Sequence, residues 1–437
     1  MLSEEENLFP MKKTLLLASL FFAGVSVAVN PAAAQAVNPV VQWNRTLLSI
    51  VRTPGAQPAT VHSTRSFAIL HAAIYDAVNS IDRTHKPYLV QLSGVSRQAS
   101  QDAAADSAAH EILVKLYPNF QTSLDSQFEQ LLAEIPDSQG KTEAIHIGET
   151  VADDILAIRN HDGSGATPPP FVPVNVPGSY QLTPPNFKPA QFTHWSNVTP
   201  FAIEFANQFR PGPPPALTSD AYEDSFNEIK SVGMLNSTTA TADQKQIGLF
   251  WNGAIQNYWN EIAQTLSIDY HLSTAQNARL FALLDLSLAD SVIAFYDAKY
   301  TFNFWRPVTA IRAADTDNNP QTLADPNWLP QSMNTAPDPS YPGAHASISH
   351  AAATVLISFF DSNRFEQQVT SETLPGVVRS FETISDIAAE ATVSRVLAGQ
   401  HFRFDENAGQ RLGDDVGDFV FDNYLTRRHH DDRNEDQ

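Results

Sequence analysis

The sequence has 437 residues, of which 43% are hydrophobic, so it can bury a substantial core and is long enough for one large helical unit or two smaller ones. Its formal net charge of −21 disfavours a general nucleic-acid or anionic-membrane binder, because either would require a broad basic surface. The lack of cysteine excludes disulfides, thiolate metal sites and cysteine nucleophiles. Any anion site must therefore be a local cluster of cations.

The N-terminal segment 11–36 has the pattern of a secretory signal: two lysines, an apolar run and the small-residue ending Ala34-Gln35-Ala36. We expect residues 1–36 to be a cleaved signal peptide, with Met11 as the true initiator, and the mature protein to be secreted or periplasmic. The alternative is a membrane anchor. The apolar run from Leu15 to Val29 is short for a membrane span, so we expect no stable membrane insertion.

Residues 37–161 read as successive amphipathic helices, since apolar residues recur at three- and four-residue spacing. The next segment, 162–217, is rich in proline and cannot be mostly helical, so it is either a linker or an ordered cap on the surface. Helical periodicity returns over 218–426 and continues through the stretch from Thr241 to Leu266. The polar tail 427–437 is expected to be disordered.

Strand-like alternation is sparse along the chain. The sequence therefore predicts an all-α protein of two helical bundles, an N-terminal bundle and a C-terminal bundle that carries an anion site.

Three stretches of the C-terminal half contain the candidate site residues. In the first, Lys299 and Arg306 are seven residues apart, so on one helix they share a face and can reach one ligand. Their aromatic neighbours suggest partial burial, and a buried cation needs a counter-charge. Asp297 on the same helix is a candidate for orienting a basic residue of the site, although a solvated acidic face is an equal alternative.

The second stretch is the sequence Pro342-Gly343-Ala344-His345, which reads as a loop that opens into a helix. The free N–H groups at such a helix start attract oxyanions, so those of Gly343 and Ala344 are candidate ligands. His345 lies in the first turn and is well placed to act as an acid or base.

The third stretch is SRVLAGQHFRFD, residues 394–405. Arg395 and His401 are six residues apart, and on one continuous helix they would lie on different faces. Gly399 is where the chain can bend, because glycine accepts the backbone angles that end a helix. Asp405 follows His401 by four residues and can fix the tautomer and basicity of the imidazole.

Together Lys299, Arg306 and Arg395 bring three positive charges to two imidazoles and a helix N-terminus. That set suits one compact tetrahedral or trigonal-bipyramidal oxyanion such as phosphate or vanadate. In a chain this acidic, the convergence of three cations would be costly without such a ligand.

The three motifs, K-x6-R-P from Lys299, Y-P-x-x-H-A from Tyr341 and S-R-x5-H-x3-D from Ser394, resemble those of the type 2 phosphatidic acid phosphatase superfamily. Within it, the chain is most similar to the secreted, bacterial branch of the vanadium-dependent haloperoxidases. The motifs cover residues 290–410, and two stretches of the N-terminal helices also resemble that branch.

The resemblance implies the cofactor vanadate, with phosphate able to occupy the same site. It implies that His401 is the single covalent ligand of the vanadium, or the nucleophile if the protein is a phosphatase. Lys299, Arg306 and Arg395 would neutralise the equatorial oxygens, Lys299 would also polarise bound peroxide, and His345 would be the acid or base.

One position departs from the family pattern: Gly343 stands where a serine is common, so a hydroxyl that would bond an equatorial oxygen is missing. The implied activity is oxidation of a halide by hydrogen peroxide to hypohalous acid. The alternatives are an acid phosphatase that acts on a phosphate ester with the same residues, and a relative that binds oxyanions without catalysis. Relatives often form dimers, so a homodimer is one assembly to consider.

Overall fold

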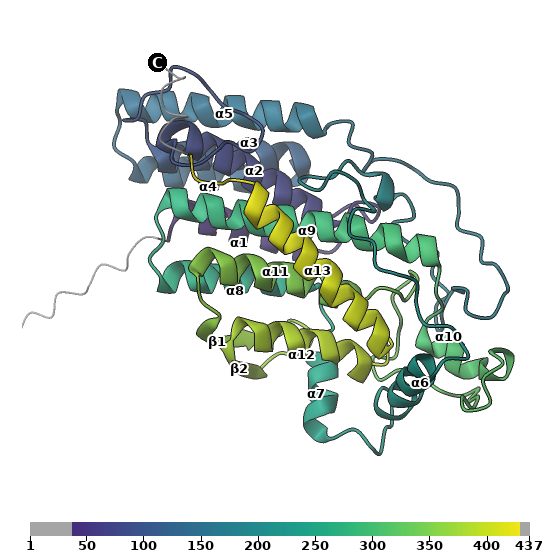
Figure 1. Ribbon diagram of the computed structural model, residues 1–437. Helices are drawn as coiled ribbons and strands as arrows, with labels where there is room; N and C mark the ends of the chain where they lie inside the picture. The colour runs from purple at the N-terminus through teal and green to yellow at the C-terminus, as the bar shows by residue number, and fades with distance from the viewer. Residues whose placement is uncertain (1–36, 429–437) are drawn as a thin grey trace, which may run out of the picture. The chain divides into compact units, whose positions relative to one another are not determined.

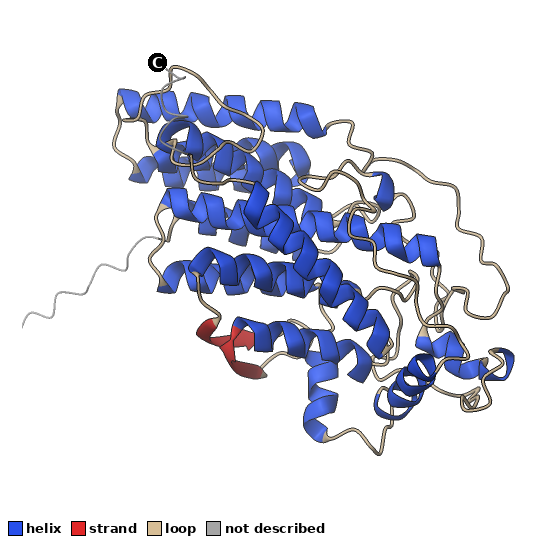
Figure 2. Cartoon of the chain, in the orientation of Figure 1, coloured by secondary structure: helices blue, strands red, loops and turns tan. Residues whose placement is uncertain are grey.

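The computed structural model describes residues 37–428, and the expected signal peptide and most of the expected tail lie outside this range. Within it the chain forms thirteen α-helices and one two-stranded sheet (Figure 2), so the predicted all-α class is confirmed. None of the helices from residue 37 to residue 428 is both long and apolar enough to cross a membrane.

The first five helices form where the apolar periodicity predicts them. Most begin at a residue whose side-chain oxygen accepts a hydrogen bond from the first turn, as Ser100 does for α3. Their bounds are α1 Pro39–Arg52, α2 Ser63–Asp82, α3 Gln101–Leu116, α4 Gln121–Glu134 and α5 Gln139–Arg159.

The proline-rich segment after α5 is ordered and mostly non-helical, with one short 3-10 helix at Trp195–Asn197. It packs near the candidate site: the Tyr180 N–H donates to the carbonyl of Asn303 at 2.8 Å, and the Tyr341 hydroxyl donates to the carbonyl of Gly212 at 2.6 Å. Of the two readings of this segment, these contacts favour a cap over a free linker.

The next helices are α6 Asp220–Val232, α7 Ala242–Phe250, α8 Ile255–Asp269 and α9 Thr274–Phe302. The stretch of helical periodicity from Thr241 to Leu266 forms two helices, α7 and α8, because the chain leaves the helical conformation between Trp251 and Ala254. Helix α9 is buried along most of its length, and it packs against α2 on one side and α11 and α13 on another (Figure 1). It ends at Asn303, which adopts a left-handed conformation (φ 48°).

The remaining elements complete the region that holds the motifs. A short antiparallel sheet, which the sequence did not predict, lies between α11 and α12. The bounds are α10 Pro307–Arg312, α11 Ala344–Phe360, β1 Arg364–Thr370, β2 Val378–Thr383, α12 Ile384–Leu397 and α13 Arg403–Asn423.

One large hydrophobic core includes residues from helices on both sides of the proline-rich segment, with α9 in its centre. A second, smaller core surrounds α10 and contains Phe304, Trp305 and Phe402. Trp305 and Phe402 of this second core are the sequence neighbours of Arg306 and His401. Two of the candidate site residues are therefore each next to a buried aromatic residue. The division of the chain into two bundles stays a prediction.

Candidate active site

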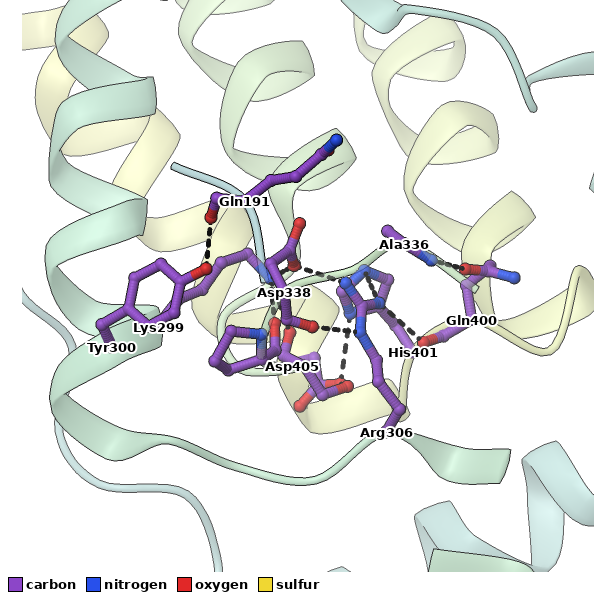
Figure 3. Close-up of polar contacts among 12 residues, drawn as sticks. Gln191, Lys299, Tyr300, Arg306, Ala336, Asp338, Gln400, His401 and Asp405 are labelled. Carbon is purple, nitrogen blue, oxygen red and sulfur yellow. Dashed lines mark hydrogen bonds and ion pairs between the residues drawn. The ribbon is translucent and has the colours of Figure 1, made fainter. Parts of the chain in front are cut away.

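Lys299 and Arg306 converge on one carboxylate. The Lys299 ammonium lies 3.0 Å from Asp338 Oδ1, and Arg306 Nη2 donates to the same oxygen at 2.5 Å (Figure 3). Both basic side chains are buried, with 0% and 1% exposure. Asp338 is thus the counter-charge that two buried cations require.

The route to this convergence differs from the one predicted. Lys299 lies in the last turn of α9, but Arg306 lies beyond the end of that helix, in extended backbone that leads into Pro307 of α10. Lys299 and Arg306 therefore do not share a face of one helix as predicted, and the left-handed turn at Asn303 redirects the chain instead. Asp297 also differs from expectation: its carboxylate binds Arg210, at 2.6 and 2.8 Å, and not a basic residue of the site.

Every N–H of Lys299 has a partner. Besides Asp338, its Nζ donates to the carbonyls of Pro339 at 2.5 Å and Ser340 at 3.1 Å. Burial lowers the pKa of Lys299 to about 8, and the negative charge of Asp338 opposes that decrease. The pKa of Lys299 therefore lies close to neutral pH, and the side chain changes charge near pH 8.

Arg306 also fixes the tautomer of His401. Its Nη1 lies 2.9 Å from His401 Nε2 (Figure 3), and a guanidinium can only donate, so Nε2 must accept. His401 Nδ1 then carries the proton and faces Asp405 Oδ2 at 3.3 Å. Burial and the nearby cations lower the pKa of His401 well below its usual value, which keeps the ring neutral.

The chain bends at Gly399 as expected, and Asp405 faces His401 as expected. Gly399 has φ +77°, between the end of α12 and the start of α13, and a Cβ there would lie 2.4 Å from the carbonyl oxygen of Gly233. Asp405 Oδ2 also accepts from Ser340 Oγ at 2.5 Å and from the N–H of Phe402 at 2.9 Å. Burial raises the pKa of Asp405 to about 6.

Arg395 is the third cation. It is buried in the last turn of α12, its Nη1 donates to Asn252 Oδ1 at 3.1 Å, and its Nε has no hydrogen-bond partner among the described residues. Burial lowers the pKa of Arg395 to about 10, and the charge of Glu406 opposes that effect. A buried guanidinium N–H without a partner is an unused donor, as an anion site requires.

His345 lies in the first turn of α11, as predicted. Its Nε2 lies 3.0 Å from the carbonyl oxygen of Trp251, which can only accept, so the ring carries its proton on Nε2 and a lone pair on Nδ1. Burial, and then the charge of Arg395, lowers the pKa of His345 well below its usual value. A neutral imidazole whose Nδ1 bears a lone pair can accept a proton.

The helix start at Gly343 differs in two ways from expectation. The Gly343 N–H already donates to the carbonyl of Asp405 at 2.8 Å, so it is not free for an oxyanion, whereas Ala344, at the first position of α11, remains a candidate. The Gly343 backbone is extended (φ −70°), so glycine is not required there for a left-handed conformation. A Cβ built at position 343 would lie 2.3 Å from Glu406 Oε1.

Glu406 is one of three site residues that the sequence reasoning missed. It is fully buried, and both carboxylate oxygens lack a hydrogen-bond partner among the described residues. Burial raises the pKa of Glu406 to about 8, and Asp405 adds to the increase. The other two are Asp338, for which the need for a counter-charge was the signal, and Asn252, which the helix break at Gly253 brings to Arg395.

Among residues 37–428, no group of three His, Cys, Asp or Glu side chains could hold a metal cation. The structure instead brings three cations close to an imidazole with an accepting Nε2. This donor set fits an oxyanion bonded to one histidine and neutralised by fixed positive charges.

Comparisons with known proteins agree with this geometry. Residues 279–430 match the family model of the VCPO second helical-bundle domain. The chain is 25% identical to vanadium chloroperoxidase from Curvularia inaequalis, across 86% of this chain and 80% of that protein. It is 29% identical to a vanadium-dependent bromoperoxidase from Ascophyllum nodosum, across 38% of this chain and 34% of that protein.

Solved structures share the fold. A bacterial vanadium-dependent iodoperoxidase superimposes with a TM-score of 0.75 at 24% identity, over 90% of this chain and 98% of that one. The holo form of a bacterial vanadium-dependent chloroperoxidase gives a TM-score of 0.66 at 17% identity, over 88% and 97% of the two chains. The resemblance predicted from the three motifs is confirmed.

Proposed function

We propose that this protein is a vanadate-dependent haloperoxidase, because residues 279–430 match the family model of the VCPO second helical-bundle domain and 86% of the chain aligns with vanadium chloroperoxidase. It uses hydrogen peroxide to oxidise a halide to hypohalous acid. Two electrons pass from the halide to the peroxide, the O–O bond breaks, an O–halogen bond forms, and the second oxygen leaves as water after protonation.

The observation that carries this proposal is the state of His401. Its Nε2 holds a lone pair, and its Nδ1–H faces Asp405. Burial, and then the charges of Arg306, Lys299 and Arg395, lower the pKa of His401 and keep the ring neutral. Nε2 would bond the vanadium, and the three cations would hold the oxygens of vanadate. A ligand at Nε2 must replace Arg306 as the partner of that atom, which frees one guanidinium N–H for an oxygen of the same ligand.

Bound vanadate supplies Lewis acidity toward peroxide, without a change in its own oxidation state. The protein supplies positioning and proton transfer. Nδ1 of His345 accepts a proton from the incoming peroxide and returns it to the departing oxygen, and its lowered pKa keeps it unprotonated beforehand. When the halide attacks one peroxide oxygen, negative charge develops on the other, departing oxygen. Lys299, as a cation, stabilises that charge.

The proposal includes export through the predicted signal peptide. Export is supported by the lysines, apolar run and small-residue ending of segment 11–36. Mass spectrometry of the protein recovered outside the cytoplasm should give an N-terminus near Val37, and recovery of an intact Met11 start in the cytoplasm would refute this part.

The activity is tested by a paired assay on one vanadate-titrated preparation. We expect oxidation of a phenol-type dye with peroxide and bromide, chloride or iodide at mildly acidic pH, and activity that rises with added vanadate. Hydrolysis of an aryl phosphate that vanadate inhibits, without halide oxidation, would favour the phosphatase. Binding of vanadate with neither activity would favour the non-catalytic alternative. Either result would refute the haloperoxidase.

A further inference from the structure

The hydrogen-bonding partners that Lys299 has among residues 37–428 all come from one loop, residues 337–341, which we name the counter-ion loop. Asp338 offers its carboxylate to Lys299 and to Arg306, and the carbonyls of the next two residues accept from Lys299 at 2.5 and 3.1 Å. Arg306 also donates to the carbonyl of Asp338 at 2.8 Å. A displacement of this loop would therefore displace two of the three cations of the candidate site.

The cap, residues 162–217, contacts the counter-ion loop at both ends. At the first end, the Gln191 N–H donates to the carbonyl of Pro337 at 2.9 Å. At the second end, the Tyr341 hydroxyl donates to the carbonyl of Gly212 at 2.6 Å. The loop is therefore fixed between two backbone groups of the cap.

Gln191 also joins the cap to α9. Its carbonyl accepts a hydrogen bond from the hydroxyl of Tyr300, the residue that directly follows Lys299 (Figure 3). One cap residue thus bridges the helix that carries Lys299 and the loop that carries its counter-ion. Loss of the Tyr300 hydroxyl would release this bridge on the side of α9.

The cap has the same kind of bond at a second place, which supplies a control. The hydroxyls of Tyr88 and Tyr424 donate to the carbonyls of Phe201 and Ala202, at 2.6 and 2.7 Å. None of these residues belongs to the site or to the counter-ion loop. Asp290 of α9 also fixes this part of the cap, because its carboxylate accepts from the N–H groups of the same two cap residues at 2.7 and 2.6 Å.

We propose that Tyr300 and Tyr341 are positioning residues of the anion site, which act through the cap: their hydroxyls fix the counter-ion loop, and the loop places Lys299 and Arg306. Both hydroxyls donate to cap carbonyls, so neither is offered to the anion. Cations that are already in place need no rearrangement when an oxyanion binds, so a looser loop lowers affinity. The inference rests on the proposed function, because it concerns the same site.

The test compares two matched double variants, each of which removes two tyrosine hydroxyls from the cap and keeps the rings. Tyr300→Phe/Tyr341→Phe changes the bonds at the site, and Tyr88→Phe/Tyr424→Phe changes the control bonds. Inorganic phosphate and vanadate are titrated by calorimetry at neutral pH. One hydrogen bond corresponds to about two- to tenfold in an equilibrium constant, so the site pair should weaken the binding of both anions by about tenfold. The control pair should change it by less than about twofold.

Hydrogen exchange separates positioning from a general loss of stability. Without anion, peptides that contain Gln191 and Ser340 should exchange faster in the site pair than in wild type and the control pair. Thermal unfolding of both pairs gives the loss of global stability for comparison. Phosphate should slow the exchange of these peptides in wild type, because the anion and the fixed loop stabilise each other.

The outcomes separate the two proposals. Equal affinity changes in the two pairs, wild-type affinity in the site pair, or unchanged exchange of both peptides would overturn the positioning role. If the site pair does not fold, Tyr341→Phe against Tyr424→Phe decides, since each removes one partly buried bond. Wild type that binds neither anion would overturn both proposals. Wild type that binds vanadate without oxidising a halide would overturn the proposed function alone, and the affinities would still decide the positioning role.

Discussion

Arg306 donates a hydrogen bond to Nε2 of His401 across 2.9 Å, and Asp405 faces the opposite nitrogen of the same ring. Because a guanidinium cannot accept, this contact fixes which nitrogen bears the lone pair. The direct ligand of the proposed cofactor is thus prepared by two residues that lie on different segments, one before α10 and one in the first turn of α13.

The contacts of Arg306 predict that lysine cannot replace it. Its guanidinium donates to the Asp338 carbonyl at 2.8 Å, the Asp338 carboxylate and the Gln400 carbonyl at 3.0 Å, besides His401. A lysine keeps the charge but loses this planar set of donors. We expect Arg306→Lys to weaken vanadate binding by at least about tenfold, roughly 1.4 kcal/mol, in calorimetric titration. Affinity equal to wild type would show that charge alone matters at this position.

Oxyanion affinity should fall as the pH rises through the pKa of Lys299, about 8. The lysine is a cation below that pH and neutral above it, so its attraction for an anion is present at pH 7 and lost by pH 9. Sulfate is the suitable probe, since its own charge is constant over this range. Titrations of wild type from pH 6.5 to 9.5 should show the decrease, and Lys299→Met, with weaker binding throughout, should lack it.

Asp338 should determine the pH at which sulfate affinity decreases. Its negative charge is the largest influence that raises the pKa of Lys299 against burial. In Asp338→Asn the lysine should therefore lose its proton at lower pH, and the decrease in sulfate affinity should move to lower pH than in wild type. An unchanged or higher midpoint in the same titration series would contradict the assignment of Asp338 as the counter-ion.

Gly399 should tolerate no side chain. An alanine there meets both the left-handed backbone and the contacts at 2.4 Å to Gly233 and 2.8 Å to Pro330. We expect Gly399→Ala to lower the free energy of unfolding by more than about 2 kcal/mol, measured in denaturant. The matched control is Gly376→Ala, which has the same left-handed backbone (φ +84°) but open space around it, and should cost about 1 kcal/mol. Equal losses in the two variants would show that backbone strain alone explains the glycine.

The features that depend on residues close together in the chain could be predicted from the sequence. Apolar periodicity predicted the helices, and Gly399 predicted the bend that separates Arg395 from His401, because both depend on residues close together in the chain. Charge arguments predicted the convergence of cations but gave the wrong route for Arg306, since the left-handed turn at Asn303 has no strong sequence signal.

The missed residues have a common cause. Asp338, Asn252 and Glu406 act on the site through contacts with segments far away in the sequence, and the burial that raises the pKa of Glu406 is set by packing. For Asp338 and Asn252 a weak signal existed, in the need for a counter-charge and in the Asn-Gly pair that interrupts a helix. The close approach of Glu406 to Gly343 depends on the packing of α11 against α13, which no local pattern contains.

The central claim is that vanadate bonds to His401, and a paired vanadate titration of wild type and His401→Ala tests it most directly. Wild type should bind vanadate in a one-to-one complex, and the variant should show no binding at the same concentrations, because no other residue of the three motifs is a candidate for the direct bond. Thermal unfolding of both proteins without anion establishes that the variant is folded. Equal vanadate affinity in the two proteins would contradict the account.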